Sequence, residues 1–353
     1  MGLGGRARFR RFGPERQLAV DLGTANTVVY QRGRGVVTFE PSVVAIDERS
    51  GEVYAVGAEA RRMIGRTPAH IKATRPLRHG VIADFDTTEQ MLRYFIRTAF
   101  HRFGSGAEVM VCIPSGVTQV ERTAVEEATL GAGASRAYLI EEPLAAAIGA
   151  DLPVADSIGS LVVDVGGGTS EMAVTALGGM VVSESVRTGG YDLDEAIVKL
   201  LQDTQRLLIG QEQAEAIKLE IGAAFPGIVD DLETQVAGRD LRTGLLRRTS
   251  VDADAVRAAL QGPLTTILDG LESVLERTPP ELAADIADRG VMLVGGGALL
   301  RGFDRLIRQR TGLAVTIAEE PLITVARGAG LALENFDGLS SKRRRKLRSS
   351  WRR

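Results

Sequence analysis

Cysteine, tryptophan and histidine are scarce: the 353-residue chain has one, one and three of them. A single cysteine excludes an intrachain disulfide, and Cys112 lies in an apolar run that favours a buried strand position over a reactive thiol. The three histidines lack the spacing of metal ligands. No apolar run approaches the roughly 18 residues of a membrane-spanning helix, and no hydrophobic stretch follows the N-terminal arginines, so we expect neither a transmembrane segment nor a secretion signal.

The composition is otherwise that of a globular protein, with 44% hydrophobic and 25% charged residues. The length predicts about two domains. We expect the protein in the cytoplasm. A net charge of −2 conceals basic ends: residues 1–16 carry +4, residues 341–353 carry +8, and the body carries −14. Such ends are attracted to anionic lipid or to nucleic acid. Leu3, Phe9 and Phe12 give the first segment the character of a weak amphipathic anchor, and a solvated tail is the alternative at both ends.

The most informative feature present is a pair of related segments, DLGTAN at 21–26 and DVGGGT at 164–169, each directly after an apolar, β-rich run. Glycine lets the backbone approach a ligand closely, and successive N–H groups in such a turn form a concave site for phosphate oxygens. One copy alone is equally well explained as a hairpin turn. Two copies predict two related half-domains that bind one polyphosphate, with these candidate contacts: Gly23, Thr24, Ala25, Asn26, Gly166, Gly167, Gly168 and Thr169.

The aspartate that opens each copy indicates a metal ion. A carboxylate beside bound phosphates is repelled unless a cation lies between them, so Asp21 and Asp164 imply Mg²⁺, held partly through water because this ion dehydrates reluctantly.

Two further segments fit the same ligand. A third glycine-rich turn, Gly295, Gly296, Gly297 and Ala298, follows the apolar run 291–294 and is expected to open a helix over 299–304, where bare backbone suits a flat base or ribose. The fourth is Glu215, Ala216, Ile217 and Lys218 on a predicted helix, with Glu215 placed to accept from ribose hydroxyls and Lys218 to lie along the base. A surface Glu/Lys pair that merely stabilises its helix is the alternative.

The order of these segments is that of the actin-like ATPase superfamily, and within it the chain closely resembles the MreB-type bacterial actins. The resemblance covers roughly residues 17–335, and the matching stretches include VDLGTANTVVY, IKATRPLRHGVIADFDTTEQML, YLIEEPLAAAIGADLP, VVDVGGGTSEMAV, AEAIKLEIG, LVGGGALLRG and PLITVARGAG. It implies an α/β fold with two ribonuclease-H-like lobes around a nucleotide cleft, each with a smaller outer subdomain, and ATP and Mg²⁺ as cofactors.

On this pattern we expect a basic tail at 1–16, a first lobe at 17–140, a second lobe at 141–314 and a basic tail at 336–353, with 315–335 returning to the first lobe. The C-terminal tail departs from the family, whose members commonly end soon after the last helix. A second departure is the stretch 244–248, which replaces a proline-containing turn common in the family.

The resemblance also implies the catalytic groups. Glu142, immediately before Pro143, matches the family position that orients the attacking water, and Thr169 matches a second position that helps to place it; Glu141 shares the first role as an alternative. Acids at a helix start can also simply complement the helix dipole. Phosphoryl transfer needs positioning and charge stabilisation more than covalent chemistry, so no nucleophile is expected.

The function implied is that of a weak Mg-dependent ATPase that polymerises into a homopolymeric filament at the inner face of the cell membrane and organises cell-wall synthesis and cell shape. Membrane contact would use the N-terminal tail or the apolar tip Phe100 and Phe103. Membrane proteins of the cell-wall machinery are possible partners, and no specific nucleic acid is expected. A metabolite kinase would need an acceptor pocket with an aspartate base, and a chaperone ATPase a long substrate domain beyond Glu334; the sequence offers neither.

Overall fold

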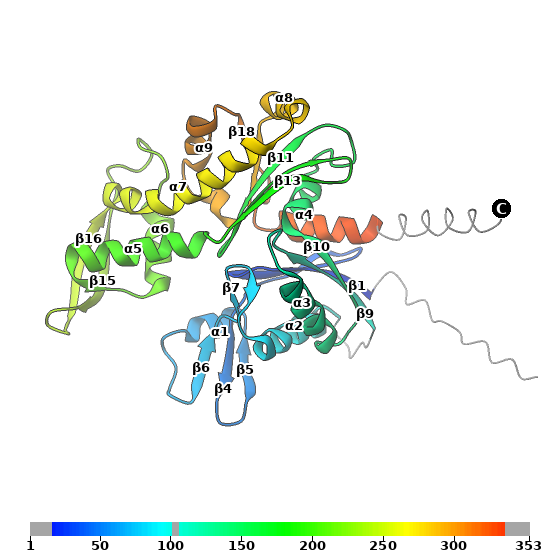
Figure 1. The fold of residues 1–353 in the computed structure, drawn as a ribbon. Helices are drawn as coiled ribbons and strands as arrows, with labels where there is room; N and C mark the ends of the chain where they lie inside the picture. Colours follow the sequence, from blue (N-terminus) through cyan, green and yellow to red (C-terminus); the bar gives the residue numbers. More distant parts are fainter. Residues whose placement is uncertain (1–15, 101–105, 336–353) are drawn as a thin grey trace, which may run out of the picture.

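The computed structural model describes residues 16–100 and 106–335. Two lobes are each built on a five-stranded sheet and carry a smaller sheet at the outer end (Figure 1). The expected basic tails, apart from Arg16, and the tip residue Phe103 lie outside the described residues. Within these residues, no helix combines the length and apolar character needed to cross a bilayer.

The two large sheets have the same topology. The first has the strand order β10-β9-β1-β2-β3 and the second the order β13-β12-β11-β17-β18. In each sheet the central strand, β1 or β11, pairs antiparallel with the next strand along the chain and parallel with a much later one. The repeat read from the sequence is therefore a repeat of structure, and Asp21 and Asp164 lie at corresponding positions near the ends of β1 and β11.

The bounds of the strands in the first sheet are β1 Gln17–Leu22, β2 Asn26–Gln31, β3 Gly35–Pro41, β9 Ala107–Ile113 and β10 Ala134–Glu141. Those in the second are β11 Ser160–Val165, β12 Ser170–Ala176, β13 Gly179–Val186, β17 Val291–Val294 and β18 Val315–Ile317. The outer sheets contain β4 Val44–Asp47, β5 Glu52–Val56 and β6 Ile71–Thr74 in the first lobe, and β14 Leu207–Leu208, β15 Glu233–Asp240 and β16 Leu246–Asp252 in the second. A short ribbon pairs β7 Leu77–Arg78 with β8 Val81–Ile82.

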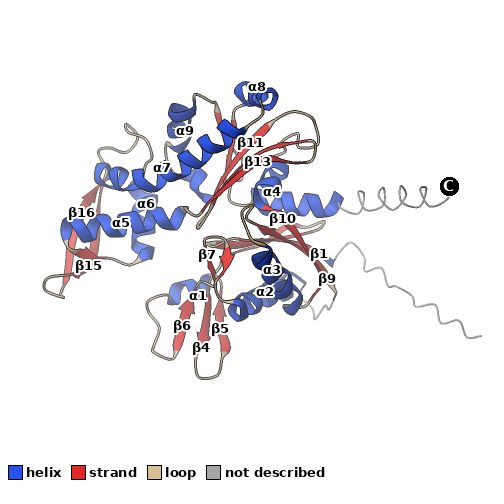
Figure 2. Cartoon of the chain, viewed as in Figure 1, coloured by secondary structure: helices blue, strands red, loops and turns tan. Residues whose placement is uncertain are grey.

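Helices fill the space around the sheets (Figure 2). Their bounds are α1 Ala58–Met63, α2 Phe85–Phe100, α3 Gln119–Gly131, α4 Glu142–Gly149, α5 Gly190–Gln205, α6 Gln211–Ile221, α7 Ala253–Arg277, α8 Pro280–Arg289, the 3₁₀ turn η2 Gly296–Leu299 and α9 Phe303–Thr311. A further helical segment runs from 324 to 335, the last described residue.

Local sequence explains several of these elements. In α2 the apolar residues recur at helical spacing, and the face formed by Met91, Leu92, Phe95, Ile96 and Ala99 is buried. A capping box between Thr118 and Glu121 starts α3, because each residue satisfies a free backbone N–H of the first turn. The Asp252 side chain similarly caps α7 by accepting from the N–H of Ala255.

Two helices occupy the space between the large sheets. Small side chains of α4 pack with the segment 324–335 and with residues of both sheets in one buried cluster: Ala19, Met110, Cys112, Ala145, Ala146, Ala147, Val162, Ala173, Val294, Val325, Ala329 and Leu333. Cys112 is buried at the end of β9, as its apolar surroundings predicted. The lobes thus share a core in addition to their separate ones.

Leu207 and Leu208 form strand β14, because they pair with Asp240 and Arg239 in the outer sheet. The β15–β16 hairpin completes that sheet. One expected element differs in the structure. The glycine turn at 295 leads into a single 3₁₀ turn, and the helix starts only at Phe303.

The expected return of 315–335 to the first lobe is wrong for its first part. Strand β18 pairs with β17 and so completes the second sheet. Only the following helical segment reaches the first lobe, where the hydroxyl of Tyr30 donates to the Glu334 carboxylate at 3.2 Å.

Candidate active site

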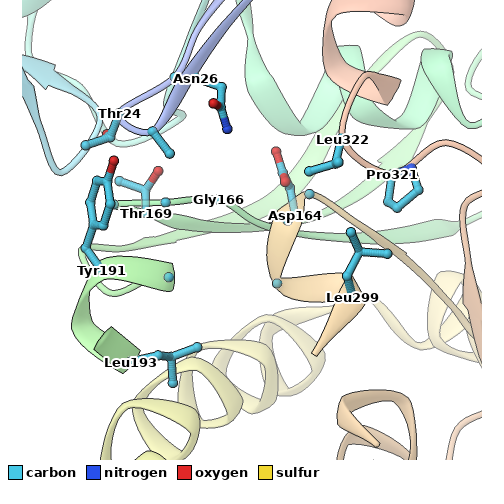
Figure 3. Close-up of a pocket in the computed structure, with 18 of the residues that line it drawn as sticks. Thr24, Asn26, Asp164, Gly166, Thr169, Tyr191, Leu193, Leu299, Pro321 and Leu322 are labelled. Carbon is cyan, nitrogen blue, oxygen red and sulfur yellow. The ribbon is translucent and has the colours of Figure 1, made fainter. Parts of the chain in front are cut away.

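The two predicted glycine turns face each other across the junction of the lobes. A Cβ atom on Gly167 would lie 2.5 Å from the Ala25 Cβ, and one on Gly168 would lie 2.7 Å from the Thr24 Oγ1. Glycine is therefore required at both positions for the turns to approach this closely. A cavity of about 400 Å³ opens beside them, and both turns line it (Figure 3).

The paired aspartates lie in this cavity. Burial raises the pKa of Asp21 to about 7 and that of Asp164 to about 8, and the Asp21 charge adds to the rise at Asp164. Two buried carboxylates that repel each other favour a bound cation, and oxygen donors are what Mg²⁺ prefers. No third His, Cys, Asp or Glu joins them in a metal-binding group within the described ranges, so ligand phosphates and water would complete the coordination. The residues present therefore fit a phosphate-bound Mg²⁺.

Glu142, the first residue of α4, lines the same cavity. It is 8% exposed, and burial, followed by the charges of Glu171, Asp21 and Asp164, raises its pKa well above the ordinary value. Thr169, which is 7% exposed, also lines the cavity. Glu141 does not: its carboxylate accepts from the Arg122 guanidinium at 2.7 Å. The structure thus separates two glutamates that the sequence left as alternatives.

The far end of the cavity is apolar. Leu299 and Leu322, with Pro321, gather on one side in Figure 3, and Leu219 also lines the cavity. These three leucines are 55%, 42% and 64% exposed, which is unusual for side chains of this kind beside a polar site. Gly295, Gly296 and Gly297 bring bare backbone to the wall, as predicted, and Gly295 has a φ of 79°. A flat, apolar ring such as a nucleotide base fits between such surfaces.

Part of the predicted nucleotide set lies elsewhere. Glu215 and Lys218 line the cavity, but Ala216 is exposed and Ile217 packs in the second lobe's core, because only positions three or four apart share one face of a helix. Ala298 is also a core residue, turned inward by the 3₁₀ geometry of η2. These three predicted contacts are corrected.

The Lys218 ammonium has two partners within the second lobe. It donates to the Gly190 carbonyl at 2.9 Å and lies 2.7 Å from the Asp194 carboxylate, whose side chain is 2% exposed. Burial raises the pKa of Asp194 to about 6, against the opposing charge of Lys218. Lys218 therefore fixes the N-terminal turn of α5 beneath the second glycine turn, where Gly190 N–H also donates to the Gly166 carbonyl.

Sequence reasoning missed several residues that the fold brings to the site. The turn at His79 and Gly80 reaches across to the glycine turns: the Gly80 N–H donates to Thr24 Oγ1 at 2.9 Å, and the His79 ring lies 3.2 Å from the Gly168 carbonyl. Asp194, Tyr191 and the apolar group Leu219, Leu299 and Leu322 were also missed. The one local signal was at Leu299, an apolar residue directly after a glycine turn.

Polar bonds also join the two outer subdomains across the mouth of the cleft. Arg61 of α1 lies 2.5 Å from Glu215 of α6, and Arg66 lies 3.1 Å from Glu212. Arg75 donates to the Tyr191 hydroxyl at 2.9 Å while its guanidinium lies over the same ring, 4.8 Å from its centre. Three arginines of the first lobe thus contact residues of the second lobe across the cleft.

Known proteins with this sequence pattern and fold are numerous. The family model described as MreB/Mbl protein matches residues 15–341. Cell shape-determining protein MreB of Escherichia coli K12 is 52% identical over 91% of this chain and 94% of its own, and cell shape-determining protein Mbl of Bacillus subtilis is 44% identical over 93% and 98%.

Solved structures agree with the sequence relatives. MreB5 of Spiroplasma citri, determined with ADP and with AMPPNP, superposes with TM-scores of 0.85 and 0.87 at 34% and 33% identity, covering 91% and 92% of this chain and 96% and 98% of its own. A MamK double helical filament, at 21% identity and a TM-score of 0.76 over 90% of this chain and 99% of its own, shares the fold. The expected actin-like architecture is confirmed, and the chain belongs to the MreB/Mbl family.

Proposed function

We propose that this chain binds Mg·ATP between its lobes, hydrolyses it slowly and assembles head to tail into filaments at the inner face of the cell membrane, where they organise cell-wall synthesis and cell shape. The observation that carries this proposal is the pair of glycine turns that meet beside one cavity with Asp21 and Asp164 in it. Support comes from relatives that are named for cell shape and from the nucleotides bound to the Spiroplasma protein.

Each part of ATP has a matching surface. The backbone N–H groups of the two turns are placed to bind the phosphates, since a nest of such groups attracts anions. Glu215, which lines the cavity, would accept from the ribose hydroxyls, and the exposed leucines of the cavity would contact the base. Asp21 and Asp164 would hold Mg²⁺, which when bound neutralises phosphate charge. Glu142 and Thr169 then orient a water molecule for attack on the terminal phosphate.

Filament formation follows if ATP changes how the lobes sit. The ligand touches turns from both lobes, so binding favours the closed arrangement in proportion to the contacts it makes only there. A closed subunit offers fixed end surfaces to the next copy, and hydrolysis removes the terminal phosphate that joined the turns.

Attachment to the membrane is proposed from the basic ends, which carry +4 and +8 against −14 in the body. Each basic residue near an anionic leaflet adds about 1 kcal/mol to the free energy of binding.

Sedimentation with lipid vesicles tests the proposal. The full-length protein should pellet with Mg·ATP, less with Mg·ADP and not with ATP in excess EDTA, while vesicles with anionic lipid should recruit more protein than neutral ones. Phosphate release measured in parallel should require Mg²⁺. Failure to pellet in every nucleotide state, together with phosphate transfer to a small acceptor, would establish a metabolite kinase instead.

The arginine contacts at the cleft mouth predict a second result. Arg61→Ala should speed the release of bound nucleotide about 1.4- to 5-fold, because a partly exposed ion pair contributes on the order of 0.2–1 kcal/mol. Stopped-flow displacement of a fluorescent ATP analogue measures this rate. Arg49→Ala is the matched control, since Arg49 pairs with Asp47 within the same outer subdomain and does not cross the cleft. Equal rates for both variants would show that the pair does not retain the nucleotide.

A further inference from the structure

A buried carboxylate that the nucleotide site does not account for spans the two lobes. Glu171 of β12 is 1% exposed. One of its oxygens accepts from both the backbone N–H and the hydroxyl of Ser115, at 3.0 and 2.6 Å, and the other accepts from the hydroxyl of Ser185 at 2.5 Å. Ser115 belongs to the first lobe, just after β9, whereas Ser185 lies opposite Glu171 on β13. The carboxylate therefore joins the lobes through the two donors of Ser115, while Ser185 binds its other oxygen from within the second sheet.

The internal repeat shows that this glutamate is not needed to build a lobe. In the second sheet Glu171 lies directly opposite Asp164, and in the first sheet the residue opposite Asp21 is Val28. Both positions are buried at the same place in the same topology. A valine is therefore enough to fill this position in the sheet, whereas the second lobe has a charged side chain there.

Such a group is costly to bury. An ionised carboxylate loses its hydration in the interior, and hydrogen bonds recover only part of that free energy. Burial raises the pKa of Glu171 against the hydrogen bonds from Ser115 and Ser185, and Glu141 adds a like charge. Gly116 is equally constrained, because a Cβ there would lie 3.0 Å from the Ser185 Cβ. The chain keeps both residues at a close contact between lobes.

This contact lies beside Glu142. Strand β10 runs parallel to β9 with Glu141 opposite Ile113, so Glu142 and the turn 114–116 leave the first sheet side by side. The Glu171 charge is also the largest charge acting on Glu142. On the other side, Glu171 is two residues from Thr169 and on the hairpin that carries the second glycine turn. A bond from Ser115 to Glu171 therefore fixes the position of Glu142 relative to that turn.

We propose that Glu171 is a positioning residue for ATP hydrolysis, which acts by tying Ser115 to β12 so that Glu142 is held at a set distance from the phosphate-binding turns. The inference rests on the proposed function. Misplacement of a reacting group by about 1 Å can cost on the order of 100-fold in rate, so the loss of this tie should affect catalysis far more than binding.

Kinetics of Glu171→Gln, Ser115→Ala and the double variant test the inference. Glu171→Gln should lower kcat for phosphate release about tenfold or more, because a neutral amide has one acceptor oxygen where three donors now share two. It should change the KM for ATP less than about threefold, because the nucleotide contacts remain. Ser115→Ala should show the same split with a smaller loss. The double variant should match Glu171→Gln alone, since both residues act through one contact.

Glu184→Gln is the matched control, because this β13 glutamate faces solvent and pairs with Arg277 at 2.6 Å, and its kcat should equal that of the wild type. A Glu171→Gln protein with unchanged kcat, or with kcat and KM altered in proportion, would overturn the inference. The proposed function would still stand as long as the wild type hydrolyses ATP. Absence of hydrolysis in the wild type would contradict the proposed function itself. If Glu171→Gln does not fold, the Ser115→Ala split decides alone.

Discussion

Glu142→Gln should lower the rate of ATP hydrolysis by about 10²- to 10⁴-fold and leave ATP affinity nearly unchanged, because a glutamine amide cannot accept the proton of an attacking water. The side chain keeps its length, so packing at the start of α4 is preserved. Single-turnover phosphate release with saturating ATP measures the chemical step, and a fluorescent analogue measures affinity. Filaments of this variant should persist after assembly if hydrolysis is what weakens them.

The structure explains why this glutamate suits the role. It lines the cavity, is nearly enclosed, and has a pKa raised well above the ordinary value, chiefly by burial and then by Glu171, Asp21 and Asp164. A carboxylate with a raised pKa is a stronger base than one in water, and a general base works best when its pKa is near the operating pH.

Glu141→Gln is the control for this prediction. The two residues are adjacent in sequence and of the same type, yet Glu141 is paired with Arg122 and has a side chain 29% exposed outside the cavity. Its replacement should change the hydrolysis rate less than about threefold. If Glu141→Gln caused the large loss and Glu142→Gln did not, the assignment of the water-orienting role would be reversed.

The sequence predicted those parts of the site whose chemistry depends on a few neighbouring residues. Asp21 and Asp164 each precede a glycine turn after an apolar run, and such a pattern has few other uses when it occurs twice. The fold followed from the same repeat, since two similar segments imply two similar sheets. The alternative of a hairpin turn was correct as well: both turns are hairpin connections, and they face each other across the junction of the lobes.

Residues that reach the site through tertiary structure could not be predicted. Leu322 follows β18 and Leu219 lies in the last turn of α6. Nothing in their local sequence indicates that they line a cavity. The wrong prediction at Ile217 has a related cause. All four residues from 215 to 218 are predicted to contact the nucleotide, whereas the helix turns the two middle residues away from the cavity. Strand β18 was placed in the wrong lobe because strand pairing depends on partners distant in the chain.

Gly328→Ala should destabilise the protein by about 1–3 kcal/mol, the usual cost of adding a methyl group to a packed interior. Gly328 lies on the segment 324–335 where it crosses α4, and a Cβ there would lie 1.8 Å from the Ala145 carbonyl oxygen. The crossing is reciprocal: a Cβ on Gly149 would lie 1.9 Å from the Thr324 carbonyl oxygen. Backbone, not a flexible side chain, opposes each methyl group, so the helices must separate. Urea unfolding followed by circular dichroism measures the change.

The comparison with Gly179→Ala separates this contact from the general effect of replacing glycine. Gly179 begins β13 at an ordinary φ with no heavy atom within 4 Å of the added Cβ, so alanine there should be neutral or slightly stabilising. Because α4 starts at Glu142, helices forced apart at Gly328 should also displace the proposed catalytic side chain and slow hydrolysis. A Gly328→Ala protein as stable as Gly179→Ala would mean that the two helices between the lobes can separate without cost.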